Sequence, residues 1–172
     1  MNKQNIKFDE IIKLDNLKTK FGIINIIAES NDILSISKRL DLFKLKTFSI
    51  ELQYKKINLN ELIANYKVFA EGEQKCVITL NPVKFIIKEQ FTINFNDHSK
   101  IELSTLESEF IEPIYNSKIN FSEIAIQMFS SFLDPYPKIN NGNIDLDKFY
   151  KNKLHLNKKK NNPFEVLNNL NK

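Results

Sequence analysis

The stretch from residue 74 to residue 95, QKCVITLNPVKFIIKEQFTINF, restricts the possible folds more than any other part of the chain. Its β-branched and aromatic residues recur at every second position, as in Val77, Thr79, Phe85, Ile87, Phe91, Ile93 and Phe95. Because successive side chains of a strand point to opposite faces, this spacing predicts strands with one buried face. Asn81-Pro82 interrupts the pattern, since proline cannot donate a hydrogen bond to a neighbouring strand. The stretch therefore predicts a β-hairpin with strands near residues 76–80 and 83–95.

Further strands are predicted on the N-terminal side of this hairpin. Residues 47–57 alternate apolar and polar side chains, residues 22–29 form a dense apolar run suited to a buried strand, and residues 8–14 fit a short strand or edge segment. Residues 61–70 fit a strand that leads through a break at Glu71-Gly72-Glu73, although their pattern also fits a helix. Strands that follow one another in this way predict an antiparallel meander.

Two segments show the apolar spacing of amphipathic helices. The first, at about residues 32–42, has Ser30 or Asn31 as its N-cap and an apolar stripe formed by Ile33, Leu34, Ile36 and Leu40. The second extends from about residue 120 to Pro135, with an apolar stripe formed by Phe121, Ile124, Ala125, Met128, Phe129 and Phe132. Both stripes are expected to pack on the sheet. The predicted fold class is α+β, with a curved antiparallel β-sheet or partial barrel, two or more helices that back it, and a basic C-terminal tail.

Charge is distributed unevenly along the chain. Residues 1–95 carry 15 basic and 11 acidic side chains, residues 96–137 carry 2 and 7, and residues 138–172 carry 8 and 3. Residues 96–120 combine five acids with little apolar periodicity, which predicts an acidic loop. We therefore expect one α+β domain at residues 1–137, with this loop inside it, and a basic, partly flexible tail at residues 138–172.

The composition also bounds where the protein is expected to work. A single cysteine excludes an internal disulfide, and 42% hydrophobic residues suffice for a core. No stretch reaches the roughly 18 uninterrupted apolar residues of a membrane span, and the N-terminal MNKQNIK lacks the apolar segment of a signal peptide. We expect a cytoplasmic protein without a membrane partner.

The sequence shows no catalytic or metal-binding pattern. Neither His98 nor His155 adjoins a nucleophile motif, so both are interpreted as solvated surface residues. Cys76 lacks the paired ligands that zinc requires and is interpreted as a small buried strand residue. Glycines at positions 22, 72 and 142 alone exclude glycine-rich phosphate-binding motifs. We expect no enzyme activity, no cofactor and no metal, and we identify no small-molecule substrate.

Two features in the C-terminal third are candidate binding sites. A cluster of ammonium groups suits phosphate neutralisation and RNA binding, and it consists of Lys151, Lys153, Lys158, Lys159 and Lys160. The alternative is a lysine run that is merely solvated. In Asp134-Pro135-Tyr136-Pro137, the first proline ends the helix, and the two prolines keep the chain that leaves the helix extended and rigid. The functional alternative is that Tyr136 presents its ring to a docking partner.

Several segments, in this order and spacing, resemble the YceD family in its alphaproteobacterial form. They are QKCVITLNPV at residues 74–83, SEIAIQMFSSFLDPYPK at residues 122–138 and NPFEVLNNL at residues 162–170. The resemblance implies a role in the accumulation of large-subunit ribosomal RNA and brings no known catalytic residues. Where many family members carry a C-x-x-C-like pair, this chain has Cys76 followed by Val77, Ile78 and Thr79, so the resemblance implies no metal or redox role there.

The first functional hypothesis is a non-enzymatic ribosome-biogenesis factor whose partner is ribosomal RNA or the pre-ribosomal large-subunit particle. The alternative is an interaction adaptor that binds a basic ribosomal protein or a processing enzyme through the acidic loop, without RNA contact. An enzyme with an unrecognised site is the third hypothesis. The first two differ in their expected salt dependence, because only phosphate contacts release counterions.

Overall fold

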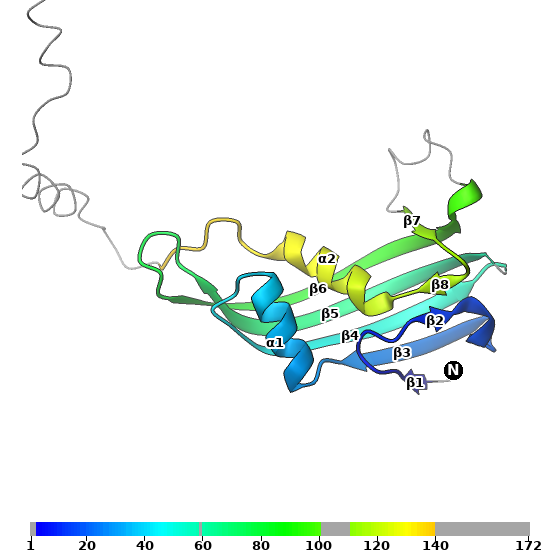
Figure 1. Ribbon diagram of the computed structural model, residues 1–172, viewed down its shortest axis with the longest axis horizontal. Helices are drawn as coiled ribbons and strands as arrows, with labels where there is room; N and C mark the ends of the chain where they lie inside the picture. The colour runs from blue at the N-terminus through cyan, green and yellow to red at the C-terminus, as the bar shows by residue number, and fades with distance from the viewer. Residues whose placement is uncertain (1–2, 59, 101–110, 140–172) are drawn as a thin grey trace, which may run out of the picture. The chain divides into compact units, whose positions relative to one another are not determined.

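A six-stranded sheet in the order β1-β3-β4-β5-β6-β7 is the framework of the fold (Figure 1). The computed structural model describes residues 3–58, 60–100 and 111–139. The strands of this sheet are β1 (Lys3–Asn5), β3 (Phe21–Ile27), β4 (Lys44–Lys56), β5 (Glu61–Lys75), β6 (Pro82–Asp97) and β7 (Ile111–Ile114). The four central strands pair antiparallel, whereas β1 and β7 pair parallel to their neighbours. The α+β class is confirmed, but the prediction of an antiparallel sheet or partial barrel is corrected, because the parallel edge strands β1 and β7 make the sheet mixed and it is not closed.

A β-hairpin whose second strand covers residues 83–95 is confirmed, but its first strand is β5 and not residues 76–80. Pairing runs without interruption from Glu61↔Asn96 to Lys75↔Pro82. The strand predicted near residues 76–80 is instead the turn, because the Cys76 N–H donates to the Asn81 carbonyl over 2.9 Å and folds the chain back. Pro82 begins β6 rather than interrupting a strand, as proline is tolerated at the first strand position.

The predicted break at Glu71-Gly72-Glu73 is also wrong, because β5 runs through it. Gly72 lies opposite Leu45 beside a register irregularity between Leu45 and Thr47. A Cβ atom at Gly72 would lie 2.5 Å from the carbonyl oxygen of Lys44. The glycine therefore permits a close approach of two backbones inside the sheet and does not end the strand.

The alternation in β4 places one row of side chains in the core. All four predicted inward residues are buried, namely Phe48, Ile50, Leu52 and Tyr54. The neighbouring strand β3 matches the apolar run predicted at residues 22–29 and pairs with β4 along its whole length. Residues 61–70, whose pattern fits either a strand or a helix, belong to strand β5.

The helix α1 (Ser30–Arg39) confirms the first predicted helix with shifted ends. Its N-cap is Glu29, not the predicted Ser30 or Asn31, because Glu29 and Asp32 form a reciprocal capping box. Ile36 is buried in the core as predicted, but Leu34 is 67% exposed. The predicted apolar stripe therefore includes one residue, Leu34, that faces solvent, because the helix face that contacts the sheet is narrower than predicted.

The helix α2 (Phe121–Phe132) lies with α1 on the same face of the sheet (Figure 1). Its N-cap is Asn120, whose side-chain oxygen accepts the Glu123 N–H over 3.0 Å. Phe121, Ala125 and Phe129 of the predicted stripe are buried and its other three residues are half-buried, with the Phe129 ring 5.2 Å from that of Phe48. A two-bonded ion pair between Arg39 and Glu123 links the two helices. The second predicted helix and its packing are thus confirmed.

The prediction of a loop over residues 96–120 is wrong where the structure describes this segment. It contains the short helix η2 (His98–Lys100), the edge strand β7 and the strand β8 (Lys118–Ile119). The strand β8 pairs with β2 (Ile12–Lys13), which is followed by the short helix η1 (Leu14–Asn16). Strands of two to four residues are too short to show periodicity, so their formation depends on partners distant in sequence. The predicted tail at residues 140–172 lies outside the described residues.

Candidate functional site

The turn between β5 and β6 and the segment that follows α2 contact each other at one end of the hairpin. The Val77 N–H donates to the Pro137 carbonyl over 2.9 Å, and the Gln74 side-chain amide donates to the Asp134 carbonyl over 2.8 Å. Figure 1 shows the segment after α2 running to this turn. We call residues 76–81 and 134–139 together the hairpin-end surface.

The hairpin-end surface presents several large apolar side chains to solvent. Leu80 and Tyr136 are each 70% exposed, and Val77 and Ile78 are each about half exposed. Single exposed apolar residues are ordinary, but here four lie on two segments that hydrogen bonds hold together. The Tyr136 N–H donates to the Asp134 side chain over 2.8 Å, which fixes the exit from the helix. Tyr136, the residue predicted to dock a partner, is therefore held on this apolar surface.

Leu80 has a backbone conformation that leucine seldom adopts. Its φ of 61° lies in the left-handed region, which costs an ordinary L-residue roughly 1–2 kcal/mol. Its side chain gains little from packing because most of it is exposed. Neither local conformation nor core packing favours leucine here, so its side chain is a candidate for contact with a partner.

Replacing Leu80 by asparagine should therefore separate folding from binding. Asparagine tolerates the left-handed region, so the free energy of unfolding is expected to rise by up to about 1 kcal/mol. Chemical denaturation measures this change. The matched variant Leu80→Ala removes the same apolar surface without relieving the backbone and should leave stability almost unchanged. A clear loss of stability in both variants would show that Leu80 supports the fold instead.

Cys76 lies at the base of the same turn. Its side chain is buried, as predicted, but in the turn rather than in a strand. Hydrogen bonds from the side chain and backbone of Thr79, and from the backbones of Ile139 and Ile78, lower the pKa of Cys76 to about 6, although burial opposes this shift.

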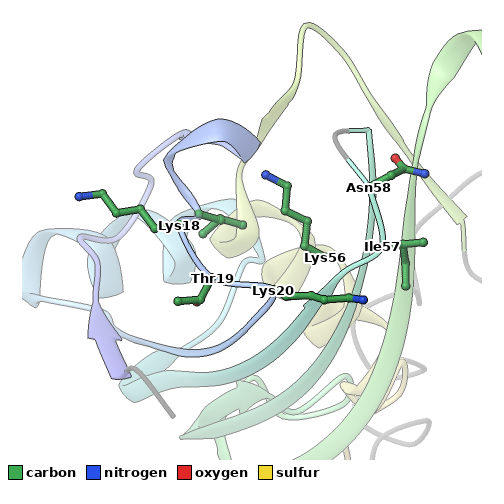
Figure 2. Close-up of a pocket in the computed structure, with 7 residues that line it drawn as sticks. Lys18, Thr19, Lys20, Lys56, Ile57 and Asn58 are labelled. Carbon is green, nitrogen blue, oxygen red and sulfur yellow. The ribbon is translucent and has the colours of Figure 1, made fainter.

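A groove lined by lysines lies between the segment before β3 and the end of β4 (Figure 2). Its volume is about 440 Å³, and it is lined by Leu17, Lys18, Thr19, Lys20, Lys56, Ile57 and Asn58. We call these residues the lysine groove. The sequence analysis did not single them out, because the two segments meet only through the pairing of β3 with β4. The only indication of this groove in the sequence is the pair of lysines in Lys18-Thr19-Lys20, directly before a predicted strand.

Three contacts fix the walls of the lysine groove. The Lys56 ammonium donates to the Leu14 carbonyl over 2.8 Å, and the Lys56 N–H donates to the Lys20 carbonyl over 2.8 Å. The hydroxyls of Thr19 and Tyr54 are 3.0 Å apart. Gly22 leaves the space for this tyrosine, since a Cβ atom there would lie 2.5 Å from the Tyr54 hydroxyl. The groove is thus part of the folded framework.

The remaining predicted site residues are placed as follows. The clustered lysines lie outside the described residues, namely Lys151, Lys153, Lys158, Lys159 and Lys160. His155 lies outside them as well, whereas His98 is exposed and its ring centre is 4.9 Å from that of Tyr115. Within residues 3–58, 60–100 and 111–139, no three His, Cys, Asp or Glu side chains are grouped to hold a metal ion.

The remaining findings concern the described part of the chain and its comparison with known proteins. No helix in the described part of the chain is long and apolar enough to cross a membrane. The described surface instead offers an apolar group at the hairpin end and a cationic groove beside β4. Comparison of the chain with models of protein families, with curated proteins and with solved structures finds no match.

Proposed function

We propose that the protein is a non-enzymatic ribosome-biogenesis factor and a divergent member of the YceD family. In this role it supports the accumulation, processing or stability of large-subunit ribosomal RNA. It does so by binding precursor RNA or a protein on the pre-ribosomal particle. The proposal starts from the resemblance of several sequence segments, and one structural observation supports it further.

That observation is the contact between the two most distinctive segments of the resemblance. QKCVITLNPV and DPYPK are separated by the whole of β6 and α2 in sequence. Hydrogen bonds from Gln74 and Val77 nevertheless join them in the fold. Because residues that share a function must share a surface, their joint position at the hairpin end supports a common docking role. Their exposed leucine and tyrosine side chains suit a protein partner on the particle.

The charge of the chain supports contact with RNA. Its formal net charge is +4, and residues 138–172 carry 8 basic and 3 acidic side chains. Lysine clusters bind nucleic acids because neutralised phosphates release their counterions. The proposed arrangement therefore combines apolar docking at the hairpin end with electrostatic contact through lysines.

Binding of large-subunit ribosomal RNA fragments over a range of salt concentrations tests the RNA contact. The full-length protein should bind, with an affinity that falls steeply as salt rises. Converting Lys158, Lys159 and Lys160 to glutamate should weaken binding and flatten the log-log salt slope by about 2 to 3 units. The same three residues changed to alanine should give an intermediate affinity, because contact is lost without added repulsion.

The second candidate is the adaptor, which was expected to bind through the acidic loop at residues 96–120, and the exposed apolar hairpin end offers it a further docking surface. An adaptor would show no salt-dependent affinity for RNA and would bind a ribosomal protein or processing enzyme instead. Its docking surface would include Leu80 and Tyr136, so Leu80→Asn should weaken binding to that protein. If the unmutated protein binds RNA with an affinity that does not change with salt concentration, RNA contact would no longer be part of the proposed function.

A further inference from the structure

The lysine groove presents positive charge in a distributed pattern. Figure 2 shows the side chains of Lys18, Lys20 and Lys56 extending in different directions around the groove. A compact anion such as a single phosphate would require ammonium groups that converge on one point. Separated ammonium groups instead match an extended polyanion, whose charges are spaced along a chain.

Two more lysines lie on the paired strands β2 and β8, and β2 leads directly into Leu14, which contacts Lys56 of the groove. Lys13 and Lys118 lie directly opposite each other in the pairing of β2 with β8, and both are exposed. Like charges at opposed strand positions repel each other and destabilise the pairing. Lys13 is followed by Leu14, whose carbonyl binds the Lys56 ammonium. No acidic side chain in the described part of the chain forms an ion pair with Lys13 or Lys118, whereas a bound polyanion would relieve their repulsion.

The lysines of the groove are free of salt bridges with acidic side chains in the described part of the chain. Other lysines are neutralised there, as in the pairs Lys46–Glu71 and Lys67–Glu51. No described carboxylate forms an ion pair with Lys18, Lys20 or Lys56. The charges of Lys18 and Lys20 are therefore available to a ligand, whereas the Lys56 ammonium also donates to the Leu14 carbonyl.

We propose that the lysine groove binds the phosphate backbone of a single RNA strand, with Lys13 and Lys118 extending the contact. This inference rests on the proposed function, and it assigns a second RNA contact that is separate from the C-terminal lysines. Thr19 and Asn58 also line the groove, where the Thr19 hydroxyl contacts that of Tyr54 and the Asn58 amide donates to the Glu61 carboxylate over 2.6 Å, so the proposed contact is carried by the lysines. Phe21, the residue after Lys20, is about half exposed and offers a ring for stacking on an unpaired base.

Binding of a single-stranded RNA of about ten nucleotides to the full-length protein tests this inference. The test variant changes Lys18, Lys20 and Lys56 to glutamine. We expect its affinity to fall about 10- to 100-fold at 0.1 M salt and its log-log salt slope to flatten by about 2 units. A variant with arginine at the same three positions keeps the charge and should retain most of the binding.

The matched control changes Lys7, Lys44 and Lys84 to glutamine, which removes the same charge from exposed lysines outside the groove. Lys44 and Lys84 both lie opposite Glu73, toward the other end of the sheet. The control should keep the affinity and salt slope of the parent. Thermal unfolding of all variants shows whether any loss of binding comes from loss of fold.

The possible outcomes distinguish failure of the groove inference from failure of the proposed function. Equal losses in the groove and control variants would mean that net charge alone matters, and the groove inference would be overturned. Unchanged binding in a folded groove variant would also overturn it, while RNA binding by the parent would leave the proposed function standing. If the parent binds no RNA even at low salt, the RNA contact in the proposed function fails together with the groove.

Discussion

Replacing Phe129 by alanine is expected to lower the free energy of unfolding by about 3–5 kcal/mol. The Phe129 side chain is fully buried, and its ring centre lies 5.2 Å from that of Phe48 and 6.0 Å from that of Phe85. Alanine would lose the transfer free energy of the ring and leave a cavity between α2 and the sheet. Urea denaturation followed by circular dichroism measures the loss.

Gln127 on the same helix provides the control for this prediction. Its side chain is exposed and makes one hydrogen bond, to Glu123 one turn earlier, over 2.9 Å. Replacement by alanine should cost less than about 0.5 kcal/mol, as is usual for such pairs on a helix surface. Similar losses at the two positions would mean that α2 does not bury the face that contains Phe129.

Replacing Gly72 by alanine is expected to cost about 1–3 kcal/mol, the range typical of overpacked cores. The added Cβ atom would lie 2.5 Å from the Lys44 carbonyl oxygen and 2.8 Å from the Phe85 ring. A backbone carbonyl cannot move aside as the end of a flexible side chain can, so β4 and β5 would have to separate locally. The same denaturation measurement applies.

The neighbouring Glu71 provides the control, because its side chain is only half-buried and pairs with Lys46 across the strands. Alanine at position 71 should cost much less than alanine at position 72. If Gly72→Ala were as stable as the parent, the two backbones would not approach as closely as the register of β4 and β5 implies.

The parts of the fold that could be predicted are those in which local periodicity and tertiary packing agree. The strand at residues 47–57 and the helix before Pro135 show their buried face directly in the sequence. The turn at residues 76–81 was missed because Val77 and Thr79 continue the alternation beyond the end of the strand. The edge strand β7 was missed because its four residues form a strand only beside β6.

The candidate sites could be predicted only in part, for the same reason. An exposed Tyr136 was one of two interpretations of the proline-flanked segment, but its neighbours on the β5–β6 turn could not be predicted. The lysine groove joins two segments that meet through strand pairing, so no motif in either segment reveals it. A cluster of residues within one segment can be recognised from the sequence alone. A site formed by two segments can be recognised only when the register of the strands that bring them together is known.

Sedimentation of the tagged full-length protein with ribosomal particles from its own cells tests the proposed function most directly. We expect the protein to migrate in a sucrose gradient with precursors of the large subunit and to be absent from the fractions of the small subunit. Ribonuclease treatment before the gradient should return it to the top fractions if RNA holds it on the particle. Migration at the top of the gradient without any treatment, or equal amounts with both subunits, would contradict a role in large-subunit biogenesis.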